Sequence, residues 1–238
     1  MMIVWNEQSI RWFRNASEYT GYNKKLSQIL LEYIPNRNTL CDMGCGAALI
    51  DFELAKTIDQ VTCIDISQEA ICAVEQMARE QGITNLSTSC MDGFDAEGQW
   101  ETVLALFHGG ADLVSKYLPL AKDQLILVTH GTQKGGFGPE HRKIKKSFGF
   151  KGVMSHLDEM GIKYHFHEYE LEHGQPFADL QEVEAFVKAY SVSLEKEELD
   201  TYLKEHLVHT GEERYPYYLP KKKHLALFVV RRDENENV

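Results

Sequence analysis

The amino-acid sequence predicts an α/β fold, with a doubly wound, mostly parallel sheet and helices on both of its faces. The main observation is an alternation: short apolar runs and helical patterns follow one another between residues 39 and 130. A second is the composition, 43% hydrophobic and 26% charged over 238 residues, which suits one large core. A third is the sequence TLCDMGCGAALI at residues 39–50, where an apolar run passes through two glycines into a helical pattern.

The N-terminal segment, residues 1–38, is predicted to be a helical cap over the sheet. Its later apolar positions recur at helical spacing, and no strand pattern precedes Thr39. Tyr19 and Tyr22 flank a Thr-Gly pair, which predicts a break between two helices. The aromatic side chains of this segment are expected to pack the cap on the sheet or to line the roof of a site.

The elements after the cap follow from β-branched apolar runs and from helical periodicity. Ser67 is the expected N-cap of the helix predicted at 68–81, and Gly82 is its stop signal. The first strand is predicted at the apolar run 39–41. Further strands are predicted at 61–66, 86–90, 103–107, 125–129, 163–171 and 225–231. Helices are predicted at 47–57, 68–81, 110–118, 180–190 and 196–207.

No repeat or linker divides the chain, so one domain over residues 1–238 is expected. Beyond the cap it comprises a cofactor-binding half, 39–130, and a substrate-side half, 131–238. Residues 131–149 are rich in glycine and basic groups and interrupt the alternation. Irregular segments of this length in a compact domain are often functional.

The net charge and the cysteine content limit the kinds of partner and metal site that we expect. The net charge of −11 disfavours a broad nucleic-acid surface. No apolar run approaches the ~18 residues of a membrane helix, and the N-terminus lacks a signal-peptide pattern, so we expect a cytoplasmic protein without a membrane partner. The five cysteines form no C-x-x-C pair, which favours reduced thiols and no metal site. A homodimer is left open.

The glycine turn is the strongest motif. Gly44 and Gly46, with Cys45 between them, lack bulk, so a ligand can lie against the backbone, and amides at the helix start can face its anionic part. Asp65 follows Gly46 by 19 residues, at the end of the second strand. An acid at that position can accept hydrogen bonds from ribose hydroxyls, which indicates a nucleoside-bearing cofactor.

The end of the third strand completes a nucleoside site. Asp92, or the backbone of Gly93, is placed to receive the exocyclic amine of an adenine, and Ile66 and Phe94 are placed to sandwich the base. All these residues fall at the carboxyl edge of neighbouring strands, where such sheets bind ligands. Each acid also has a plainer interpretation, as a helix cap or loop former.

The series Asp42-x-Gly44-x-Gly46, Asp65 and Asp92 resembles the class I S-adenosylmethionine-dependent methyltransferases, most closely over residues 39–130. The resemblance implies a Rossmann-like sheet of seven strands with an antiparallel last strand, and S-adenosylmethionine as cofactor. It implies that Asp42 and the glycine turn hold the methionine part, Asp65 the ribose and Asp92 the adenine. By the same resemblance, Tyr19 or Tyr22 touches the methionine end.

Two alternatives stay open. A dinucleotide-binding oxidoreductase would carry a third glycine where this chain has Leu49. A non-catalytic S-adenosylmethionine-binding protein, regulatory or accessory, would need the same cofactor site. The acid before the turn suits a ligand with an ammonium group better than one with a pyrophosphate.

The acceptor side is less defined. In the family, the fourth strand end borders the transferred methyl, and here it carries Phe107 and His108. His108 is a candidate general base, because imidazole titrates near neutral pH, although a structural histidine is equally compatible. His130, after the fifth strand, is a weaker candidate. The tetrapeptide that marks base- and glutamine-methylating members is absent, which favours a small-molecule acceptor.

Two basic runs and one histidine pair remain. The run Arg142-Lys143-x-Lys145-Lys146 is expected to attract an anionic acceptor or to form a solvated helix face. The three lysines at 221–223 are expected to form a polar turn. His165-x-His167 places two imidazoles on one strand face, without evident further metal ligands.

Overall fold

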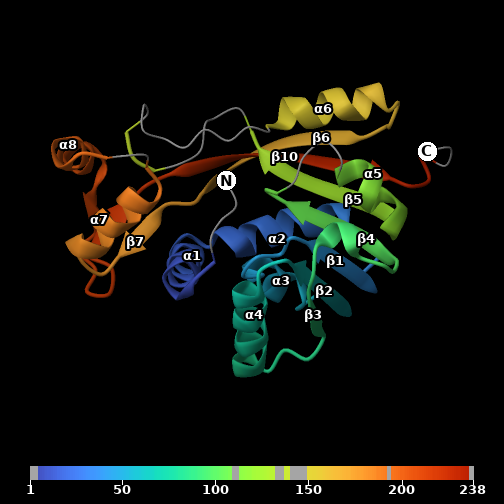
Figure 1. Cartoon of the computed structure of the whole chain (residues 1–238), viewed down its shortest axis with the longest axis horizontal. Helices are drawn as coiled ribbons and strands as arrows, with labels where there is room; N and C mark the ends of the chain where they lie inside the picture. The colour runs from blue at the N-terminus through green and yellow to red at the C-terminus, as the bar shows by residue number, and fades with distance from the viewer. Residues whose placement is uncertain (1–4, 109–112, 132–136, 140–148, 192–193, 236–238) are drawn as a thin grey trace.

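The core of the molecule is a seven-stranded sheet in the order β3-β2-β1-β4-β5-β10-β6 (Figure 1). The computed structural model describes residues 5–108, 113–131, 137–139, 149–191 and 194–235. The strands of this sheet are β1 (Thr39–Met43), β2 (Gln60–Asp65), β3 (Leu86–Cys90), β4 (Trp100–Leu106), β5 (Ala121–His130), β6 (His165–Glu172) and β10 (Lys222–Arg231).

The strand directions confirm the predicted fold class. β1 pairs in parallel with β2 and β4, β2 with β3, and β4 with β5. β10 lies antiparallel between β5 and β6. The last strand along the chain is therefore the antiparallel one. Because β1 to β5 are parallel, their carboxyl ends meet at one edge of the sheet.

Helices cover both faces of the main sheet, as predicted. The α-helices in the described parts of the chain are α1 (Glu7–Thr20), α2 (Tyr22–Tyr33), α3 (Leu49–Leu54), α4 (Gln68–Gln81), α5 (Leu113–Tyr117), α6 (Phe150–Glu159), α7 (Leu180–Ala189) and α8 (Lys196–His206). Successive strand residues point to opposite faces, so Leu104 packs in a core with α2, α3 and α4, whereas Val103 packs in a core with α5 and α6. Both cores are buried and continuous.

Capping residues set the limits of the helices close to where the sequence indicates. The Ser67 side chain accepts a hydrogen bond from the amide of Ala70, and Gly82 ends α4 with φ of 66°. Gly21, with φ of 67°, separates α1 from α2. The helix predicted at 47–57 is shorter, because Ala48 adopts φ of 51° just before α3.

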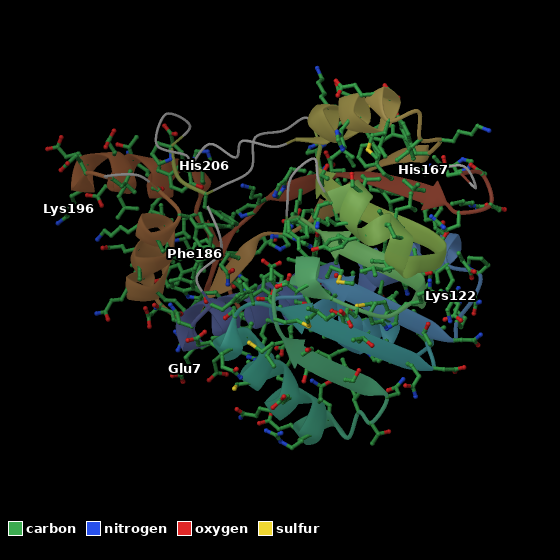
Figure 2. The ribbon with its side chains drawn as sticks, turned by 45° about the vertical axis from the view of Figure 1, so that its right-hand side comes forward. Glu7, Lys122, His167, Phe186, Lys196 and His206 are labelled. Carbon is green, nitrogen blue, oxygen red and sulfur yellow. The ribbon has the colours of Figure 1, made fainter. Side chains whose placement is uncertain are left out.

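A small lobe beside the main sheet was not predicted. It contains a second sheet of order β7-β9-β8, made of β7 (Gln175–Phe177), β8 (Val208–His209) and β9 (Tyr217–Leu219). Trp12 of α1 packs here with Phe177 and with Phe186 of α7, which is labelled in Figure 2. Strands of two or three residues carry too little alternation to be recognised in a sequence. The N-terminal cap is therefore split, with α2 on the main sheet and α1 against the lobe.

Several expectations fall outside the described residues. The basic run at 142–146 is one, and so are the first residues of the helix predicted at 110–118. The predicted polar turn at 221–223 differs from the structure, where Lys222 and Lys223 already belong to β10. Within the described parts of the chain, no helix has the length and apolar character needed to cross a membrane.

Candidate active site

Three predicted acids lie at the carboxyl edge of adjacent parallel strands. Asp42 is the next-to-last residue of β1, Asp65 is the last residue of β2, and Asp92 follows β3. The carboxylates of Asp65 and Asp92 both act electrostatically on the His108 imidazole at the end of β4. The topology thus brings together the residues that the sequence predicted from separate motifs.

The glycine turn is closed by its own hydrogen bonds. The amides of Gly44 and Cys45 both donate to the carbonyl of Ile64, at 2.7 and 3.0 Å. The amide of Gly46 donates to Oδ2 of Asp65 at 2.8 Å, and the other Asp65 oxygen accepts from the amide of Ser67. The backbone amides that we expected to face an anionic ligand therefore donate to acceptors of the protein itself. A carboxylate has about four acceptor lone pairs, so Asp65 retains capacity for hydroxyl donors.

Two aromatic rings lie against the glycines. A Cβ built on Gly46 would come within 2.4 Å of the Trp5 ring, and one on Gly44 within 2.7 Å of the His108 ring. Both glycines also have positive φ, 75° for Gly44 and 56° for Gly46. The glycines are required by the backbone conformation and by this close packing. Sequence reasoning placed Trp5 only generally in the aromatic cap, because nothing local shows where its ring docks.

Trp5 provides a fluorescence prediction. A ligand seated on the glycine turn must contact or displace the Trp5 ring, so titration with S-adenosylhomocysteine is expected to change the tryptophan emission. In Trp5→Phe the change should fall to less than about a third, because Trp12 and Trp100 pack elsewhere. An undiminished change in Trp5→Phe would show that the turn is not where the ligand binds. Trp100→Phe is the matched control.

Beneath the turn lies a pair of buried acids. Asp42 and Asp51 are 1% and 0% exposed, and among the described residues no donor side chain pairs with their oxygens. Burial, reinforced by the neighbouring Asp51 carboxylate, holds the pKa of Asp42 well above its usual range. Burial likewise raises the pKa of Asp51 to about 7. At neutral pH the pair therefore retains a proton and forms an acidic site that a cation would satisfy.

This pair should make folding stability depend on pH. Between about pH 4 and pH 7 the folded state holds protons that the unfolded chain has released, so the free energy of unfolding falls as pH rises through that window. Asp51→Asn is expected to raise the free energy of unfolding at pH 8 by about 1–3 kcal/mol and to flatten the decline. Urea denaturation at pH 5 and pH 8 measures both effects. Exposed Asp59→Asn should change neither, and an equal effect of the two variants would exclude the buried pair as the cause.

The adenine part of the predicted site consists of exposed apolar side chains near Asp92. Ile66 and Phe94 are 59% and 42% exposed, although both are large and hydrophobic. Asp92 accepts a hydrogen bond from the amide of Phe94, so its loop-forming role is also present. Tyr117 of α5, which sequence reasoning missed, packs against Phe94 at 5.6 Å between ring centroids, and its hydroxyl would lie 2.7 Å from a Cβ on Gly93.

His108 lies between this site and the rest of the edge. Burial lowers the pKa of His108, while a hydrogen bond to the Met43 backbone and the Asp65 and Asp92 carboxylates oppose that shift. The imidazole is therefore neutral at pH 7 and able to accept a proton. The preceding residue, Phe107, has φ of 58°, an unusual conformation for a bulky side chain. Such strain is found where the surrounding structure holds a functional side chain in place.

The two tyrosines assigned to the methionine end lie elsewhere in the cap. Tyr19 packs against Tyr218 and Tyr215 and donates to Glu212, all on the small-lobe side. Tyr22 is 1% exposed and packs edge-on against the ring of His173. The contact of Tyr19 or Tyr22 with a cofactor therefore remains a prediction.

The histidine pair on β6 is separate from the site. His165 lies 3.0 Å from Glu234, and His167, labelled in Figure 2, packs against Tyr33. In the described part of the chain, no group of three or more His, Cys, Asp or Glu side chains is arranged to hold a metal ion.

The sheet order, the antiparallel position of β10 and the acidic glycine turn define the class I methyltransferase fold. Residues 36–115 match the family model described as a methyltransferase domain. The resemblance seen in the sequence is thereby confirmed, and S-adenosylmethionine is the cofactor that the family implies.

Solved structures show the same fold over more of the chain. A SAM-dependent methyltransferase from Aquifex aeolicus is 15% identical, with a TM-score of 0.54, over 71% of this chain and 94% of that one. Magnesium protoporphyrin IX methyltransferase from Synechocystis PCC 6803, solved with bound SAM, is 15% identical, with a TM-score of 0.52, over 96% and 86%. Precorrin 8w decarboxylase from Methanobacterium thermoautotrophicum is 14% identical, with a TM-score of 0.51, over 87% and 89%. A search of curated proteins finds no match.

Proposed function

We propose that the chain is an S-adenosylmethionine-dependent methyltransferase that transfers a methyl group to a small-molecule acceptor by in-line displacement. The observation that carries the proposal is the pair of buried acids, Asp42 and Asp51, directly below a glycine turn. A buried carboxyl pair without donor partners favours a cationic ligand, and S-adenosylmethionine carries both an ammonium and a sulfonium group.

The residues around the turn fit the other parts of this cofactor. Asp65, with spare acceptor capacity, would receive the ribose hydroxyls. Ile66 and Phe94 would cover the adenine ring, because both are exposed apolar side chains and the amide of Phe94 donates to Asp92. Phe107, Cys45 and the glycines would border the methionine part. Burial of these apolar side chains by the base would contribute to affinity.

The chemistry follows from the position of His108. The bound cofactor supplies an electrophilic methyl group, and the protein contributes alignment and exclusion of water. In this proposal the neutral His108 imidazole takes the proton that the acceptor loses, and the lowered pKa of His108 supports that role. The His108 ring lies against Gly44, so the proposed base borders the glycine turn.

Dinucleotide binding is less well supported. A pyrophosphate needs free amides and positive potential, whereas here the amides of Gly44, Cys45 and Gly46 donate within the protein. Three carboxyl groups, those of Asp42, Asp51 and Asp65, also surround the turn. An anionic ligand would therefore be repelled where a cationic one would be attracted.

Calorimetry and a turnover screen test the proposal. We expect S-adenosylhomocysteine and S-adenosylmethionine to bind and NAD not to bind. A labelled-methyl transfer screen against a metabolite extract should then reveal an acceptor. Binding without transfer in that screen would favour the non-catalytic alternative, and failure to bind either adenosyl compound would refute both.

A further inference from the structure

Tyr117 packs against the loop that carries the predicted adenine contacts. It is the last residue of α5 and is 2% exposed. A Cβ built on Gly93 would come within 2.7 Å of the Tyr117 hydroxyl oxygen, whereas the next nearest atoms, Cζ of the same ring and the sulfur of Met43, would be 3.5 and 3.6 Å away. The last two distances are ordinary contacts. The hydroxyl oxygen therefore leaves no room for a side chain at position 93.

The backbone at Gly93 does not itself require glycine. Gly44 and Gly46 have φ in the left-handed region, but Gly93 does not. Gly93 begins a short 3₁₀ turn behind Asp92, whose side chain accepts from the amide of Phe94. Alanine can adopt this conformation without strain. The absence of a side chain at position 93 is therefore explained by packing against Tyr117.

The Tyr117 ring also connects two strand ends that the sheet does not join. Its centroid is 5.6 Å from that of Phe94, which follows β3, and 6.2 Å from that of His108, which follows β4. β2 and β1 lie between β3 and β4, so these two strands are not paired. Phe94 is also too exposed for burial to fix its position. A buried ring that touches both ends can hold their separation.

The hydroxyl of Tyr117 stays neutral in this acidic part of the edge. Burial raises the pKa of Tyr117, and the carboxylates of Asp92 and Asp42 raise it further. The phenol therefore does not titrate in the pH range in which His108 would work. Its influence on the site comes from contact and not from proton transfer.

We propose that Tyr117 is a positioning residue that sets the separation between the adenine site and His108, through its hydroxyl against Gly93 and its ring against Phe94 and His108. The inference rests on the proposed function, because it takes these two strand ends as the places of the cofactor base and the proton acceptor. A displacement of Gly93 should then reach His108 through the Tyr117 side chain, although the two residues follow strands that do not pair.

Paired substitutions test this link. Gly93→Ala places a methyl group against the Tyr117 hydroxyl, and Tyr117→Phe removes that oxygen but keeps the ring, so the double variant regains ordinary contacts. Gly149→Ala is the control for the glycine, since nothing lies within 4 Å of the added methyl group. Tyr190→Phe is the control for the hydroxyl, because the Tyr190 ring packs on Phe186 in the small lobe.

The first measurement is the affinity for S-adenosylhomocysteine by calorimetry. Gly93→Ala should bind about tenfold more weakly or worse, because overpacking displaces the loop. Tyr117→Phe should stay within about threefold of the parent, and the double variant within about threefold of Tyr117→Phe. Gly149→Ala should match the parent, and Tyr190→Phe should not correct Gly93→Ala.

The second measurement is the imidazole NMR signal of His108 in the protein without cofactor, assigned by its loss in His108→Ala. This signal should move in Gly93→Ala and return, in the double variant, to its position in Tyr117→Phe. Tyr117→Leu, which removes the ring and leaves Gly93 in place, should also move the signal. Circular dichroism shows that each variant is folded, and Tyr117→Leu tests the link to His108 even if Gly93→Ala does not fold.

The results separate this inference from the proposed function. If Gly93→Ala behaves as the parent, or if Tyr117→Phe does not correct it, the methyl group does not act through Tyr117 and the inference is wrong. If the His108 signal is unchanged in Tyr117→Leu, the ring does not position His108 and the inference is again wrong. If the His108 signal responds as expected but the parent does not bind S-adenosylhomocysteine, the link through Tyr117 stands and the proposed cofactor is wrong.

Discussion

Replacing His108 by alanine is expected to lower methyl transfer about 100-fold or more, because a positioned general base contributes roughly 10²–10⁴ to the rate. The affinity of the His108→Ala variant for S-adenosylhomocysteine should change less than about threefold, since the acids and the glycine turn remain. The measurement is turnover with the acceptor found by the labelled-methyl screen, alongside calorimetry. His165→Ala, a histidine exposed on β6, is the control and should behave as the parent.

The pH profile separates a base from a packing role. Burial lowers the pKa of His108, so the parent should keep its neutral, active imidazole below pH 6.5 and lose activity only under more acidic conditions. That acidic limb should disappear in His108→Ala. Because the ring packs against Gly44, a structural role would instead weaken cofactor binding and leave the shape of the profile unchanged. Equal turnover by variant and parent would remove His108 from the mechanism.

Asp42→Asn should have two large effects of opposite sign. Losing the carboxylate is expected to weaken S-adenosylhomocysteine binding about tenfold to 100-fold, because a charge-assisted hydrogen bond to the ammonium is lost. The free energy of unfolding at pH 8 should rise by about 1–3 kcal/mol, because Asp51 no longer faces a second buried acid. Calorimetry and urea denaturation on the same preparation measure both.

A variant that merely damages the fold would lower both quantities together, so the opposite signs are diagnostic. The parent should also bind S-adenosylhomocysteine more tightly at pH 8 than at pH 5.5, since the ammonium must displace a proton shared by Asp42 and Asp51. The exposed Asp59→Asn control should leave affinity, stability and pH dependence as in the parent. Unchanged affinity in Asp42→Asn would exclude this acid from the cofactor site.

Sequence reasoning was most successful where function depends on position along a strand. The ends of β1, β2 and β3 were identified because apolar runs stop at acids or glycines, and parallel pairing then brings those ends to one edge. The antiparallel last strand came from the family resemblance and is confirmed by the pairing of β10 with β5 and β6. Helix limits at Ser67 and Gly82 were predictable because capping is local chemistry.

Residues whose role depends on burial or on tertiary packing were not predictable. Asp51 looks like an ordinary helical acid until α3 buries it against Asp42, and Tyr117 looks like a core aromatic until α5 places it beside Phe94. Lys223 was interpreted as part of a polar turn, yet β10 carries it onto the ring of Phe107. The small lobe was missed because its strands have only two or three residues, and because β7 pairs with residues of β9 that lie 40 to 44 positions further along the chain.

The sequence by itself determined the α/β fold class, the order of its main elements and the acidic glycine turn, because these depend on periodicity and on residue types at strand ends. Only the tertiary structure decided which side chains meet at the strand ends: Trp5 on Gly46 and His108 on Gly44 at the turn, and Lys223 on Phe107 after β4. The physical reason is that ring packing, burial of paired carboxyls and the sign of the local potential are properties of groups brought together by the fold. No one of those residues carries them alone.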